Sequence, residues 1–279
     1  MSNPAFNRLE QDARSGYAGF QSSGAPGHPT APHVGSDYPT QEQLQEMYAQ
    51  PSAGPVQTDR VTMDDVIMRT LTLFGIVLVT GTAGWLLSAA NPSLGLLLWG
   101  GGVVGTLVIG LIIAFRKVLS VPLILTYAVF EGLFVGALSQ SWNDRYDGLV
   151  GQAVLATVAT FAGMFLAYKA GWIKVTNKFR RIMVMALAGY AIFALINFGY
   201  ALITSQPLGF GGSGGLGIAI SVFAVGLAAF TLALDFDQIE YAIATGAPRQ
   251  YSWLLAHGLI VTLVWLYVEF LRLFARLRD

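Results

Sequence analysis

Seven long apolar runs constrain this chain more than any other feature of its sequence. They extend over residues 66–90, 94–114, 121–141, 149–170, 181–203, 216–237 and 252–275. Each has roughly the 20 mainly apolar residues that a helix needs to cross the hydrocarbon core of a bilayer. A helix also pairs all of its own backbone polar groups, as lipid requires. The sequence therefore predicts an all-α, polytopic membrane bundle of seven transmembrane helices over residues 60–279.

The composition supports lipid as the solvent for most of the chain. Charged residues make up 11% of the 279 residues, whereas a soluble domain usually has about 25%. The 16 basic residues balance the 16 acidic residues, so we expect no nucleic acid partner. Cysteine is absent, which excludes disulfides and thiolate catalysis, and two of the three histidines, His28 and His33, precede the first run.

Residues 1–59 differ from the rest of the chain. They are rich in Gly, Pro, Ser and Gln, and such a segment cannot bury enough apolar surface to offset its ordering entropy. We predict a disordered tail, and because residues 1–20 lack the apolar core of a signal peptide, the first span is expected to direct insertion. Thr62 and Asp65 have the spacing of a capping box, which predicts the start of the first helix.

Basic residues near the ends of the runs predict the orientation. One side of the membrane collects Arg60, Arg69, Arg116, Lys117, Lys169, Lys174, Lys178, Arg180, Arg181 and Arg249, whereas Arg145 is the one basic residue in the loops of the other side. We therefore place the first side, with the N-terminus, in the cytoplasm. Seven full spans put Arg272, Arg276 and Arg278 outside, against the rule, so a re-entrant last segment is the alternative to the seven full spans that we favour.

Four acidic residues lie in or at the edge of the apolar runs: Glu131, Asp235, Asp237 and Glu269. An ionised Asp at a helix centre costs roughly 2.5–3.5 kcal/mol on insertion scales. Such a group is expected to face the bundle interior, to find a partner, or to be protonated. Two close carboxylates titrate as a coupled pair. The four acids are therefore our candidates for a proton-gated or cation-conducting site.

Each candidate also has a purely structural interpretation. Glu131 lies in mid-span without a charged residue within one helical turn, and a hydrogen bond to the backbone or to a tyrosine would satisfy it. Glu269 precedes Arg272 by three residues, which is the spacing of an intrahelical ion pair. Asp235 and Asp237 lie near a helix end, where solvation at the interface is the alternative. His257 is a candidate pH modulator, and its structural alternative is an interfacial histidine.

Enzyme templates fit the sequence poorly. It has no Walker loop and no His-Glu-x-x-His motif, and the glycine-rich segment 209–215 has no lysine and no nearby base. Asp235 and Asp237 are two residues apart on one helix and point in different directions, unlike the two aspartates of an intramembrane protease. We expect no catalytic activity and no resident metal.

The polar motifs occur in a recognisable order. They are Glu131-Gly132 in the third run, Leu-Asp-Phe-Asp-Gln-Ile-Glu over 234–240, Gly-Ala-Pro over 246–248, and Leu-Tyr-Val-Glu-Phe over 266–270. In this order and spacing the chain resembles the Bax inhibitor family, also called transmembrane BAX-inhibitor-motif or YccA-like proteins, and its bacterial branch in particular. The resemblance covers residues 60–279.

The resemblance implies a pH-sensitive calcium leak, gated in part by one carboxylate in the sixth span and one in the last. By motif these are Asp235 and Glu269. The chain departs from the family pattern because the second acid is Glu rather than Asp, because Asp237 lies beside the first, and because the interval between the two is longer. A strict seven-span count puts them at different depths, which leaves Asp237, Glu131 or His257 as alternative partners.

We therefore expect a leak channel for cations in the bacterial plasma membrane. Ca²⁺ is the expected permeant ion, bound transiently near Asp235, because a hard cation prefers oxygen ligands. Whether acid opens or closes the pore stays open at this point, as does the oligomeric state. The alternatives are a non-conducting regulator or scaffold that binds other membrane proteins, and a proton-coupled transporter, against which the lack of an internal repeat counts.

Overall fold

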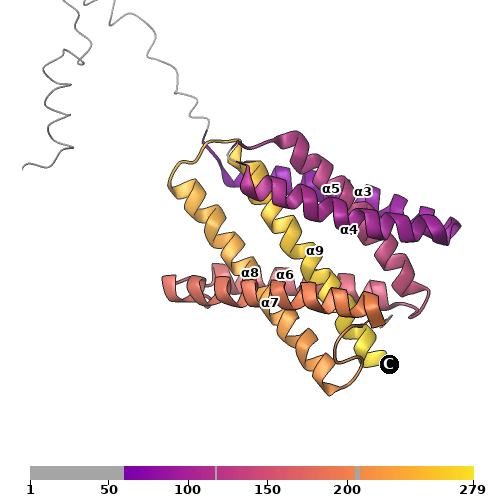
Figure 1. The fold of residues 1–279 in the computed structure, drawn as a ribbon. Coiled ribbons are helices and arrows are strands. Elements are labelled where there is room, and N and C mark those ends of the chain that lie inside the picture. Colours follow the sequence, from indigo (N-terminus) through magenta and orange to yellow (C-terminus); the bar gives the residue numbers. More distant parts are fainter. Residues whose placement is uncertain (1–59, 117, 205–207) are drawn as a thin grey trace, which may run out of the picture. The chain divides into compact units, whose positions relative to one another are not determined.

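The computed structural model describes residues 60–116, 118–204 and 208–279, and these residues form an all-helical bundle (Figure 1). The helices are α3 (Met63–Ala90), α4 (Pro92–Phe115), α5 (Val121–Asn143), α6 (Leu149–Lys169), α7 (Asn177–Thr204), α8 (Gly215–Ala244) and α9 (Tyr251–Arg278). All seven are long and apolar enough to cross a membrane, which confirms the predicted fold class. The predicted disordered tail, residues 1–59, lies outside the described residues.

The helix ends follow from local sequence signals. Thr62 caps α3 as predicted, because its hydroxyl accepts a hydrogen bond from the Asp65 amide at 3.2 Å while its own amide donates to the Asp65 carboxylate at 3.3 Å. The sixth run was predicted to end at residue 237, but α8 continues to Ala244. It ends where Gly246 adopts a left-handed φ of 67° and the Ala247 amide reaches back to the Ala242 carbonyl, a stop that favours glycine.

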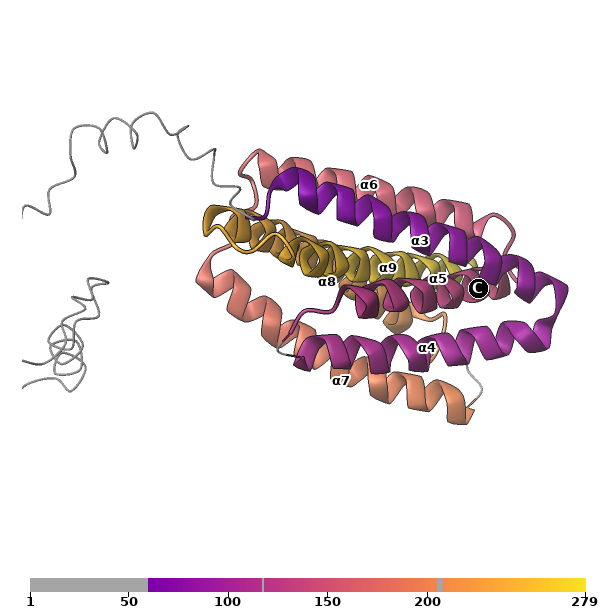
Figure 2. The ribbon, with the colours of Figure 1, turned by 90° about the horizontal axis from the view of Figure 1, so that it is seen from above.

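Helix α9 lies at the centre of the bundle. Its apolar stretch is 61% buried, whereas those of α4 and α7 are each 6% buried. Figure 2 shows α9 in the middle, with α4 and α7 along one edge, and α9 packs on α3, α5, α6 and α8. Because α9 is one continuous helix of 28 residues without a break, it has the length and apolar character of a full span rather than the turn of a re-entrant segment.

Helices α3 and α5 pack closely through small residues. A Cβ atom at Gly136 would overlap the carbonyl oxygen of Gly81, and one at Gly132 would overlap the hydroxyl of Thr80. The four-residue spacing of Gly132 and Gly136 therefore brings two backbones together within the chain, which is the role that small residues have in membrane bundles.

The helices alternate in direction, so their ends form two faces. The basic face holds the starts of α3, α5, α7 and α9 and the ends of α4, α6 and α8, and an Arg249–Asp65 ion pair of 2.8 Å joins two of these ends. The C-terminal face holds the opposite ends. There Arg278 donates to the Asp147 carbonyl at 2.6 Å, and Tyr146 donates to Asp279. The last helix is thus tied down at both faces.

Candidate functional site

Asp235 lies on α8, on the side that faces α9. Its Oδ2 atom is buried and has no hydrogen-bond partner. The side chain of α9 that lies against the Asp235 carboxyl is Thr262, which is 5% exposed and donates its own hydroxyl hydrogen to the Gly258 carbonyl at 3.2 Å. No basic residue pairs with Asp235 in the part of the chain that the structure describes. Asp235 therefore keeps an acceptor available inside the bundle.

Sequence reasoning missed Thr262, although a signal for it exists. Helices α8 and α9 are antiparallel neighbours joined by a short turn. Asp235 comes nine residues before the end of α8, and Thr262 comes eleven residues after the start of α9. The two positions are therefore at nearly the same depth. Counting outward from the turn would have selected Thr262 as the residue opposite Asp235.

Glu269 lies further along α9, and one of its carboxylate oxygens accepts three hydrogen bonds. It is 2% exposed. Its Oε1 atom accepts from the Tyr190 hydroxyl at 2.6 Å, from the Trp265 indole nitrogen at 3.2 Å and from Arg272 at 3.0 Å. The ion pair with Arg272 is the structural alternative that the three-residue spacing predicted, and the structure contains it.

Asp235 and Glu269 do not form the carboxylate pair that the resemblance implied. Glu269 follows Thr262 by seven residues on α9, which is about 10 Å along a helix axis. No hydrogen bond joins the two carboxyl groups among the described residues. The longer interval between them, noted in the sequence, is the physical reason, because an antiparallel hairpin fixes the depth of each residue by its distance from the turn.

Glu131 belongs to a second buried cluster, between α5 and α9. It is 4% exposed and accepts a hydrogen bond from the Tyr127 hydroxyl at 3.1 Å through Oε1, while Oε2 has no partner. The Tyr127 ring meets the ring of His257 edge to face, with centroids 4.5 Å apart. His257 is 9% exposed, so it packs in the interior rather than at an interface. The hydrogen bond to a tyrosine that we predicted as the structural alternative for Glu131 is present, but it satisfies only one of the two carboxylate oxygens.

Asp237 lies apart from these groups, at the basic face. It forms an ion pair of 2.5 Å with Arg180 of α7, and both side chains are partly exposed. One helical turn further on, Glu240 accepts from the Tyr168 hydroxyl at 2.9 Å and lies 3.9 Å from Lys169. The interfacial interpretation of Asp237 is the one that agrees with this position.

Two arginines near the end of α9, Arg272 and Arg276, have partners within the bundle. Arg276 is 4% exposed and donates to the Leu208 carbonyl at 2.7 Å, and a Cβ atom at Gly217 would overlap its guanidinium. Arg272 is held by Glu269. Both therefore have partners in the protein and are not part of a solvated loop. The third arginine, Arg278, is exposed at the C-terminal face, so the predicted orientation of this face stays a prediction.

The acidic groups are dispersed rather than gathered into a metal site. Among the described residues, no group of three or more His, Cys, Asp or Glu side chains lies close enough together to hold a metal ion. A tight Ca²⁺ site would need about six to eight oxygen ligands. Single carboxylates at successive depths can instead attract a passing cation or bind a proton.

Seven spanning helices with carboxylates in their interior define a multi-pass membrane protein whose polar chemistry lies inside the bundle. The family model described as Bax inhibitor 1 like matches residues 3–279, and the chain belongs to this family. The resemblance is thereby confirmed, and the match also extends over the N-terminal segment, which we had placed outside it.

A curated relative gives a narrower match. An uncharacterized protein of Chlamydia muridarum (strain MoPn / Nigg) is 31% identical over 94 residues, which are 32% of this chain and 40% of that protein. The chain thus aligns with about two fifths of the length of this relative.

Proposed function

We propose that this protein is a pH-sensitive leak channel for cations, with Ca²⁺ as the permeant ion. The observation that carries the proposal is the pair of unpartnered carboxylate oxygens in the bundle interior, Asp235 Oδ2 and Glu131 Oε2. Membership of the Bax inhibitor family supports it. The proposal places the protein in a bacterial plasma membrane with the basic face and the N-terminus in the cytoplasm, and it assigns no catalytic activity.

Burial without a partner is costly for a polar atom, because the membrane interior contains no water to replace the missing hydrogen bond. A proton or a cation supplies the missing partner. Both bind the same oxygen, so they compete. Protonation of Asp235 removes the charge that attracts a cation, and the flux therefore depends on pH through this residue.

Glu269 has a different part in the proposal. It forms an ion pair with the guanidinium of Arg272, in the half of the bundle nearer the C-terminal face. A positive charge in a pore wall raises the barrier for cations. The pair neutralises that charge. Glu269 thus sets the barrier through Arg272, whereas Asp235 and Glu131 attract the ion directly.

The test is Ca²⁺ flux into proteoliposomes across a range of pH. Asp235→Asn is expected to lower the flux about tenfold, which corresponds to roughly 1.4 kcal/mol of lost ion stabilisation, and to flatten its pH dependence. Glu131→Gln is expected to have a smaller effect of the same kind. Asp237→Asn, which alters a partly exposed interfacial pair, is the matched control and should leave the pH dependence unchanged.

A non-conducting regulator of other membrane proteins is the alternative. It predicts no Ca²⁺ flux through the wild-type protein, and mutant effects on stability alone. If the wild type conducts Ca²⁺ and both Asp235→Asn and Glu131→Gln keep the same flux and the same pH response, these two residues are not part of the ion pathway.

A further inference from the structure

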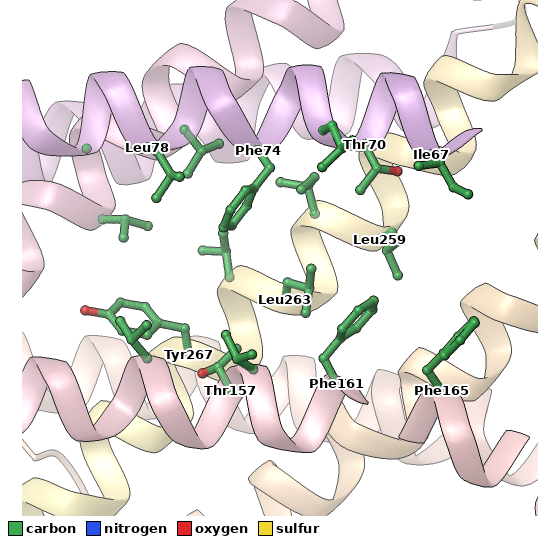
Figure 3. Close-up of a pocket in the computed structure, with 18 of the residues that line it drawn as sticks. Ile67, Thr70, Phe74, Leu78, Thr157, Phe161, Phe165, Leu259, Leu263 and Tyr267 are labelled. Atoms are coloured by element: carbon green, nitrogen blue, oxygen red, sulfur yellow. The ribbon is translucent and has the colours of Figure 1, made fainter. Parts of the chain in front are cut away.

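A long groove runs between α3 and α6, with α9 as its floor (Figure 3). Its volume is about 900 Å³. Its walls carry Phe74 and Leu78 from α3 and Phe161 and Phe165 from α6, and Leu263 of α9 lies between them. Helices α3 and α6 do not pack on each other. The groove is therefore open sideways, toward the lipid.

Most side chains that line the groove are apolar, although the buried Thr70 hydroxyl has no hydrogen-bond partner. Three of its hydroxyl groups are already paired within the protein: Thr82 with the Leu78 carbonyl at 2.8 Å, Thr157 with the Ala153 carbonyl at 2.7 Å, and Tyr267 with Ser139 at 2.7 Å. Such a surface suits an apolar occupant. A bilayer supplies acyl chains at this depth.

One end of the groove is polar and the other is not. The charged residues that line it are Lys169 and Glu240, both at the basic face. Their charged atoms are 3.9 Å apart and each side chain is about half exposed, so the pair is loose and both groups can accept further partners. The opposite end is lined by Trp85, Leu86 and Val150. The occupant that matches this pattern is an amphiphile with its head at the basic face.

We propose that the groove binds a zwitterionic phospholipid of the leaflet at the basic face. One acyl chain lies between α3 and α6 and covers Leu263. The phosphate of the head group pairs with Lys169, and the ammonium group of an ethanolamine head pairs with Glu240. An apolar transmembrane helix of a partner protein would not require a basic and an acidic residue together at one end of the groove. A lipid with a zwitterionic head group uses both, so it matches the groove better.

The central position of α9 makes the proposal testable. In the intact protein in vesicles, a phosphatidylethanolamine with a diazirine on its acyl chain is expected to label Leu259 and Leu263 of α9, mapped by mass spectrometry. These residues line the groove near the middle of the helix, whereas the exposed apolar residues of α9, Tyr251, Leu254 and Leu277, lie near its two ends. Label restricted to the outer surfaces of the peripheral helices would overturn the proposal.

Two neighbouring residues of α6 provide a blocking variant and its control. Val154 lines the groove and is 46% exposed, whereas Leu155 is 72% exposed and does not line it. Val154→Trp should lower the labelling of Leu263 several-fold, and Leu155→Trp should leave it unchanged. Equal labelling in the two variants would show that the lipid does not enter here. Because both side chains are exposed, neither substitution has to be accommodated in the core.

The head group is tested with the same diazirine acyl chain on phosphatidylglycerol and on phosphatidylcholine. The proposal expects phosphatidylethanolamine to label α9 most strongly and expects Glu240→Gln to remove its advantage over the anionic lipid. Stronger labelling by phosphatidylglycerol in the wild type, or cross-links between two chains at Leu263 in place of lipid adducts, would contradict it.

Discussion

Two carboxylates of the bundle, Asp235 on α8 and Glu269 on α9, have opposite surroundings although both face the bundle interior. Glu269 accepts hydrogen bonds from Tyr190, Trp265 and Arg272, whereas Asp235 retains a buried oxygen without a partner. The first arrangement stabilises a charge in place, and the second leaves a charge that a mobile proton or cation can neutralise. The difference indicates that burial alone does not mark a functional acid. What distinguishes Asp235 is a buried carboxylate oxygen that has no hydrogen-bond partner.

The largest effect is expected at Glu269. Glu269→Ala leaves the Arg272 guanidinium without its counter-ion, and breaking a buried pair in this way costs about 3–5 kcal/mol. Because Arg272 is 40% exposed, we expect the lower end, about 3 kcal/mol of unfolding free energy. Reversible unfolding in mixed micelles measures this, with Glu269→Gln as a milder variant that keeps an acceptor oxygen. A change below about 1 kcal/mol in Glu269→Ala would show that the Glu269 site does not stabilise the fold.

Tyr190→Phe tests a single donor of the same site. The 2.6 Å hydrogen bond to Glu269 has a charged acceptor, and such bonds contribute about 1.5–3 kcal/mol. We expect a loss near 2 kcal/mol. In the double variant Tyr190→Phe with Glu269→Ala, the combined loss should be smaller than the sum of the two single losses, because both substitutions remove the same bond. Additive losses would mean that Tyr190 stabilises the bundle through packing with Trp265 instead.

Most of the fold could be predicted from the sequence, and less of the site. The seven spans and the Thr62 cap are local properties of composition and spacing, so they can be read without knowing the packing. The Glu269–Arg272 pair is also local, because both residues lie within one helical turn. The contacts of Tyr190 with Glu269 and of Arg276 with Leu208 join positions 79 and 68 residues apart. They depend on which helices become neighbours, which no local pattern specifies.

The difference between local patterns and long-range contacts also explains why Asp235 and Glu269 do not form the carboxylate pair that the resemblance implied. The motif that resembles the family identified Glu269 as the partner of Asp235, but a motif gives the order of residues and not their depth. Depth follows from counting along the α8–α9 hairpin, and that count places Thr262 opposite Asp235. The family match is thus informative about the fold, whereas geometry assigns the neighbours.

Asp235→Asn should affect stability in the opposite sense to Glu269→Ala. No bond to a basic group is lost, and an amide is cheaper to bury than an ionised carboxylate. We expect an unfolding free energy equal to that of the wild type or higher by about 1 kcal/mol, because the variant no longer buries a charge that lacks a basic partner. The same unfolding assay measures it. A loss above 1 kcal/mol would show that Asp235 has a stabilising partner and would place it in the same category as Glu269.

The smallest effect is expected at the basic face, where Asp237 pairs with Arg180. Both side chains are partly exposed, so the charges are screened, and exposed pairs contribute about 0–1 kcal/mol. Arg180→Gln should lower the unfolding free energy by about 0.5 kcal/mol at low salt and by less at 1 M salt, where the Debye length falls to about 3 Å. Asp237→Asn should give a similar value, since each variant removes the same pair. If either variant cost as much as Glu269→Ala, or if salt left the loss unchanged, the pair would belong to the protected interior. The contrast between a solvated acid at the face and the acids inside the bundle would then be wrong.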